Sequence, residues 1–122
     1  MQDHAVALRL ADEMPNVACF HAQQSAEKSV KAILVARCGD AARDHSIVAL
    51  LRESEAAGLD VDAGLVDDAR RLDKFYVSSR YPDALGGLDP TTMFGLSEAT
   101  EAATQASRFI EFAKRTIDEE FG

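Results

Sequence analysis

The sequence predicts an all-α protein, an antiparallel up-and-down four-helix bundle with one additional short helix. Residues 17–38 place their apolar side chains on one side when projected at about 100° per residue. Apolar residues of 96–117 alternate by three and four. No segment shows the every-second-residue alternation of a half-buried strand. At 122 residues the chain is expected to form a single domain, 1–122, with a modest core.

Residues 17–38 are predicted to be the central core helix. The buried side consists of small residues in its first half and branched aliphatic residues in its second: Cys19, Ala22, Ala26, Val30, Ile33 and Leu34. Small residues allow another helix to approach closely. The opposite side and the flanks carry the polar residues His21, Gln24, Ser25, Lys28 and Lys31. This polar edge is a candidate wall of a binding site.

A shorter helix, residues 2–14, is expected before the central one. Pro15 separates the two, and Asn16 is the expected N-cap of the central helix. Gly39 follows at the position typical of a left-handed C-terminal residue. The third helix should begin near Ser46, with Asp44 as its cap.

The third helix is expected to end at Gly58, and the fourth to run from about Asp62 to Arg80, with Leu65, Ala69, Leu72 and Tyr76 on one face. Pro82 forbids a further turn. Residues 81–95 contain two Pro and three Gly and are expected to form a long loop, a kind of segment that is often functional. The last helix should begin near Leu96, with Ser97 as a candidate cap and an Ala-rich seam suited to close packing within the bundle or across a dimer.

Charge and composition narrow the function classes. The chain has 13 basic and 21 acidic residues, a net charge of −8, which disfavours a nucleic-acid binder that uses its whole surface. Only residues 16–38 are net positive, so an anion site should draw on them. No apolar run is long enough to cross a bilayer and the first residues carry acids, so cytoplasmic residence is expected.

The sequence offers no metal or cofactor motif. Cys19 and Cys38 lie at opposite ends of one predicted helix, about 28 Å apart, and cannot form a disulfide within it. No Cys/His cluster suggests zinc, and no glycine-rich phosphate loop or catalytic motif is present. We therefore expect no metal, no cofactor and no catalytic residue.

Several aromatic and charged residues lie close together in sequence at the end of the fourth helix. Tyr76 and Arg80 are four residues apart, and Tyr81, Pro82 and Asp83 follow directly. Arg80 either caps the last carbonyl groups of the helix or offers a planar fork to a phosphate or carboxylate. The tyrosine side chains either close the end of the bundle or stack on a ligand.

Three segments together resemble a HEPN domain (higher eukaryotes and prokaryotes nucleotide-binding domain). They are CFHAQQSAEKSVKAILVARCG at 19–39, DHSIVALL at 44–51 and FYVSSRYPDA at 75–84, followed by an Ala-rich last helix. The resemblance implies a helical bundle that dimerises, encoded beside a minimal nucleotidyltransferase in a toxin–antitoxin-like pair. It also implies nucleotide binding or, in many members, metal-independent ribonuclease activity.

The ribonuclease branch of the resemblance requires Arg followed by His after four to six residues, and this sequence has no such pair. We therefore expect a HEPN module that binds a nucleotide or polyanion, or a partner nucleotidyltransferase, without catalysis. One wall of its site would contain Gln24, Lys28 and Lys31. The other would contain Tyr76, Arg80, Tyr81 and Asp83, with His45 at the mouth. The alternatives are a ribonuclease toxin that uses Arg80, His45 or Tyr81, and a purely structural dimer.

Overall fold

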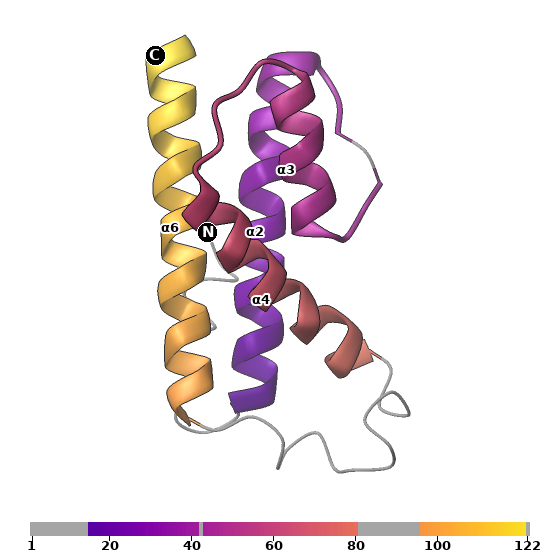
Figure 1. The fold of residues 1–122 in the computed structure, drawn as a ribbon, viewed down its shortest axis with the longest axis vertical. Helices are drawn as coiled ribbons and strands as arrows, with labels where there is room; N and C mark the ends of the chain where they lie inside the picture. The colour runs from indigo at the N-terminus through magenta and orange to yellow at the C-terminus, as the bar shows by residue number, and fades with distance from the viewer. Residues whose placement is uncertain (1–14, 42, 81–95, 122) are drawn as a thin grey trace.

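The residues described by the computed structural model, 15–41, 43–80 and 96–121, form four α-helices and no strand (Figure 1). The helices are α2 (Pro15–Cys38), α3 (Ile47–Ala56), α4 (Ala63–Arg80) and α6 (Leu96–Phe121). The predicted all-α bundle is therefore confirmed. The helix expected at 2–14 and the loop 81–95 lie outside the described residues.

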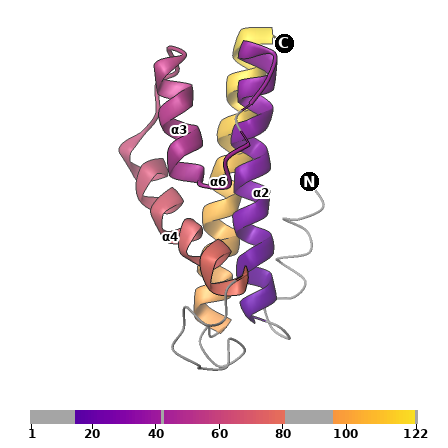
Figure 2. The ribbon, with the colours of Figure 1, turned by 90° about the vertical axis from the view of Figure 1, so that its right-hand side faces the viewer.

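Helices α2 and α6 form the long axis of the molecule and run in the same direction. Their C-terminal ends meet at an ion pair in which Arg37 Nη1 lies 2.7 Å from Glu120 Oε1. Helix α4 runs opposite to α6, because Asp68 pairs with Arg108 while Arg71, further along α4, lies 3.8 Å from Glu101. Figure 2 shows α3 and α4 together on one side of the α2–α6 pair.

The core is built mainly from alanines and aliphatic residues, as the sequence predicts. Every residue named for the buried side of the central helix is at most 1% exposed. Leu65, Ala69 and Leu72 bury the predicted face of α4. The α6 face adds two aromatic rings, Phe109 and Phe112, to its alanines. The hydrophobic effect of this shared cluster holds the four helices together.

Local sequence chemistry fixes most helix ends. Gly39 and Gly58 have φ angles of +83° and +94°, the left-handed conformation that favours glycine. Two predicted N-terminal details are wrong. α2 begins at Pro15, whose missing N–H costs nothing at a first helical position, so Asn16 lies inside the first turn. α6 begins at Leu96, which places Ser97 inside that helix and not at its cap.

The start of α3 also differs from the prediction. Its N-cap is Ser46, whose hydroxyl accepts a hydrogen bond from Ala49 N at 3.2 Å. Asp44 instead accepts from Ser46 N at 2.9 Å and closes the turn before the helix. Both residue types are good caps, and the one closer to the helix occupies the position.

Candidate functional site

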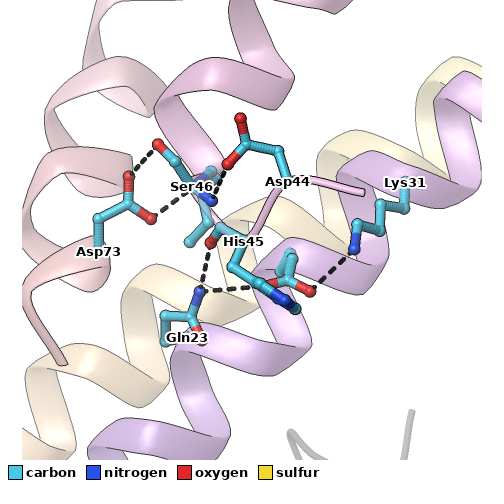
Figure 3. A network of polar contacts seen from close by, with 8 residues as sticks. Gln23, Lys31, Asp44, His45, Ser46 and Asp73 are labelled. Atoms are coloured by element: carbon cyan, nitrogen blue, oxygen red, sulfur yellow. Dashed lines mark hydrogen bonds and ion pairs between the residues drawn. The ribbon is translucent and has the colours of Figure 1, made fainter. Parts of the chain in front are cut away.

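The candidate site lies where α2, the linker before α3 and α4 meet. Gln23 of α2 is fully buried, and its side-chain Nε2 donates to the backbone carbonyl of His45 at 3.0 Å. The same nitrogen lies 3.3 Å from Glu27 Oε1, one turn further along α2. Gln23 therefore ties the end of the linker to α2 and fixes the backbone of His45 (Figure 3).

Three aromatic rings form a stack at this place. The His45 imidazole lies 4.9 Å from the Tyr76 ring, centroid to centroid, with an angle of 12° between the planes. On α2, Phe20 stacks with the same tyrosine at 6.4 Å and 29°. The His45 side chain is 52% exposed, so this stack ends in a ring that solvent can reach.

Glu27 connects the stack to a lysine. Its side chain is only 8% exposed, and Oε2 lies 3.1 Å from Lys31 Nζ. Oε1 lies 3.4 Å from His45 Nδ1, at the long end of hydrogen-bond range. When Nδ1 carries the proton of the neutral ring and donates it to this carboxylate, Nε2 is the unprotonated nitrogen. The Glu27 carboxylate thus lies within 3.4 Å of both the Lys31 ammonium group and the His45 imidazole.

Asp73 of α4 holds the linker from the other side. Its carboxylate accepts hydrogen bonds from Ile47 N at 2.7 Å, Val48 N at 3.2 Å and Ser46 Oγ at 3.0 Å. Burial raises the pKa of Asp73, an effect that these hydrogen bonds oppose and the charge of Asp44 reinforces. His45 is therefore fixed between two tertiary contacts, one to α2 through Gln23 and one to α4 through its neighbour Ser46.

The structure brings several of the expected site residues together. His45 and Tyr76 are in contact, and Lys31 reaches His45 through Glu27. Gln24 is partly buried and Lys28 is exposed, both on the same edge of α2 as Lys31. Arg80 is the last residue of α4, but its side chain, like Tyr81 and Asp83, lies outside the described residues.

Sequence reasoning missed Gln23 and Glu27. The signal for them was the spacing of four in Gln23, Glu27 and Lys31, which places the three side chains on one line along a helix. Gln24, chosen for its exposure, is one position away from the glutamine that makes the contact. Asp73 had no local signal, because its partners lie 25 to 27 residues earlier.

The described part of the chain brings no three His, Cys, Asp or Glu side chains together in a way that could hold a metal ion. Both cysteines are free, Cys19 buried and Cys38 exposed. Within the described helices, none combines the length and apolar composition needed to cross a bilayer. The chemistry that the site offers is stacking, positive charge from Lys31 and acid–base chemistry from Glu27 and His45.

Fold and site together define a helical-bundle domain with a polar, aromatic-lined site beside its central helix. The chain belongs to the HEPN domain family, whose model matches residues 4–116. Two solved structures are similar to it. TT1696 from Thermus thermophilus is 33% identical with a TM-score of 0.84, over 94% of this chain and 90% of that one.

The second is ST0689, described as an archaeal HEPN homologue. It is 32% identical with a TM-score of 0.78, over 95% of this chain and 89% of that one. A comparison with curated proteins gives no match. Family membership thus rests on the family model and on likeness to these structures over almost the whole chain.

Proposed function

We propose that this chain is a cytosolic HEPN module that binds a nucleotide at the site between α2, the α2–α3 linker and α4. The observation that carries the proposal is the half-exposed His45 ring, which stacks on Tyr76 beside the Lys31 ammonium group. A nucleobase stacks on such a ring, and base–aromatic stacking is worth about 1–3 kcal/mol. The nearby lysines suit the phosphates.

The charge pattern of α2 supports the same proposal. Lys28 is exposed and Lys31 partly exposed, within a segment that is net positive in a chain of net charge −8. The Glu27 carboxylate accepts hydrogen bonds, so it suits a ribose hydroxyl or an exocyclic amine of a base. The site therefore offers one group for each of the three parts of a nucleotide.

Isothermal titration calorimetry with ATP, GTP and AMP tests this proposal. His45→Ala removes the outer ring and should weaken binding about tenfold, the equivalent of about 1.4 kcal/mol. His45→Phe keeps a ring in the stack and should retain most of the affinity. Lys28→Gln should weaken the binding of ATP more than that of AMP. The matched control is Lys114→Gln, at an exposed lysine of α6, and it should change neither affinity.

Two results would reject nucleotide binding at this site. One is the absence of heat and of thermal stabilisation with all three nucleotides, which would favour a structural dimer that only holds a partner. The other is binding that His45→Ala and Lys28→Gln leave unchanged, which would place the nucleotide elsewhere on the chain.

A second candidate function is ribonuclease activity. It is favoured by the approach of Glu27 to His45 Nδ1, because a carboxylate behind an imidazole orients the second ring nitrogen as a general base. Incubation with transfer and messenger RNA in EDTA tests it. Cleavage that is abolished in both His45→Ala and His45→Phe would replace the binding proposal, since Phe restores the stack but not the base.

The proposal includes protein partners. Membership of the HEPN family supports a homodimer and a complex with a minimal nucleotidyltransferase encoded nearby, as in toxin–antitoxin-like pairs. Light scattering of the purified chain tests the dimer. Co-expression with the neighbouring reading frame, followed by size-exclusion chromatography, tests the complex.

A further inference from the structure

A second surface, separate from the nucleotide site, lies at the other end of α4. It is a groove of about 1080 Å³ between the C-terminal half of α6, the α3–α4 connection and the first turns of α4. Its α6 lining extends from Thr104 to Glu120, about 24 Å at 1.5 Å per residue. None of the residues of the nucleotide site lines it.

The groove combines an apolar floor with acidic walls. Leu59, Val61, Leu65 and Phe112 are its apolar lining residues. Its walls carry six acidic residues and three arginines, a net charge of −3. An apolar floor between charged walls is typical of a surface that receives an amphipathic segment.

Two of the three arginines already form ion pairs with acids of the groove. Arg108 donates two hydrogen bonds to Asp68, at 2.7 and 2.8 Å, and Arg37 pairs with Glu120 at 2.7 Å. Among the described residues, no ion pair neutralises the four remaining acids, which are Asp60, Asp62, Glu111 and Glu119. Of the arginines, only Arg115 is left to balance them.

The end of α6 carries charge of the wrong sign for helix stability. The last turn has no basic residue, and Asp118, Glu119 and Glu120 lie at the negative end of the helix dipole. The ion pair with Arg37 offsets one of these acids. Local rules of this kind are typically broken at functional sites, so the acids at this end of α6 favour a positively charged occupant.

We propose that this groove binds a basic amphipathic helix of a partner protein. The length of the groove fits about 16 helical residues. Apolar side chains of the occupant would cover Leu59 and Val61, which are partly exposed, and its Lys or Arg residues would face Glu111 and Glu119. This inference is independent of nucleotide binding.

Fluorescence anisotropy with a labelled helical peptide of about 16 Leu and Lys residues tests the proposal. Two control peptides define specificity: the same residues in an order without an apolar face, and the same order with Glu for Lys. The amphipathic basic peptide should bind the full chain at least tenfold more tightly than either control, with an affinity that falls as salt rises.

Matched variants locate the binding surface. The double variant Glu111→Gln/Glu119→Gln should weaken binding of the basic peptide at least fivefold. Glu53→Gln/Glu55→Gln changes the net charge equally at two exposed acids of α3 outside the groove, and should leave binding unchanged. Val61→Ser should also weaken binding, because it changes the floor and leaves all charges in place. Circular dichroism melts confirm that each variant is folded.

Three outcomes would overturn the proposal. Equal weakening by the two double variants would mean that the peptide responds to the overall negative charge. Equal binding of the amphipathic basic peptide and its reordered control would show that the groove does not select an amphipathic helix. Loss of a homodimer in Glu111→Gln/Glu119→Gln, seen by light scattering, would make the occupant a second copy of this chain.

Discussion

The carboxylate of Asp73 on α4 accepts a hydrogen bond of 2.7 Å from the backbone N–H of Ile47, at the start of α3. Together with the bond from Val48 N, this contact satisfies N–H groups that a helix leaves without an internal partner, and the Ser46 hydroxyl donates to the same carboxylate. The N-terminus of one helix is thus capped by the side chain of another. The same contact positions His45, which directly precedes Ser46.

Asp73→Ala should lower the free energy of unfolding by about 1–3 kcal/mol, because it removes a cap and leaves backbone donors unsatisfied. Urea denaturation followed by circular dichroism measures the loss. Asp67→Ala is the control, an exposed aspartate of the same helix that should cost less than about 0.5 kcal/mol. Equal losses would show that the contact of Asp73 with the N-terminus of α3 contributes nothing to stability.

The titration of Asp73 should oppose the acid destabilisation that carboxylates usually cause. Burial, the largest effect, raises its pKa above the ordinary 3.8. The folded chain therefore holds this proton more tightly than the unfolded chain, so the Asp73 contribution to stability falls as pH rises from 3.8 through the folded pKa. Carboxyl-carbon NMR of Asp73 measures the value, and a pKa below 3.8 would contradict the expected direction.

The pair between Arg108 and Asp68 should be worth more than an exposed pair on the same helix. Asp68 is 4% exposed and receives both hydrogen bonds from one guanidinium group, so Arg108→Ala leaves a buried carboxylate without its donor. We expect a loss of about 1–3 kcal/mol in urea denaturation.

Arg70→Ala is the comparison, since Arg70 and Asp67 are 60% and 64% exposed and 3.5 Å apart. That loss should stay below about 0.5 kcal/mol. A larger effect for Arg70 than for Arg108 would show that burial of the acid does not set the strength of these pairs.

The two cysteines should differ sharply in reactivity. Burial, helped by the charge of Glu98, raises the pKa of Cys19 to about 12, whereas Cys38 is exposed at the end of α2. A thiol-specific chromogenic reagent at about pH 8 should therefore modify one thiol per folded chain and the second only after unfolding. Cys38→Ser should abolish the fast phase and Cys19→Ser should preserve it; rapid modification of both thiols would refute the buried position of Cys19.

Sequence reasoning predicted those features that depend on spacing within one helix. Leu65, Ala69 and Leu72 share a face at intervals of three and four, and that interval alone identified them as buried. The glycine that ends α2 was likewise predictable, because its φ of +83° suits few other residues.

The site was predictable only in part, because its geometry depends on contacts between distant segments. Gln23 shares the helix face of Cys19 and Ala26, so its burial was predictable, but its hydrogen bond to the His45 carbonyl depends on where the linker lies. The contact of His45 with Tyr76 joins residues 31 positions apart, beyond the range of any helical period. Proximity of the two rings therefore required the fold.

The parallel helices α2 and α6 each contain alanines that can be neither lengthened nor shortened without a loss of stability. Ala22 and Ala26 of one helix, and Ala99 and Ala106 of the other, are completely buried in the shared core. A longer side chain at these positions overfills the core at a cost of about 1–3 kcal/mol. Glycine, the only smaller choice, weakens the helix itself by about 1 kcal/mol. These buried alanines, although they have the simplest side chains of the core, thus tolerate little substitution.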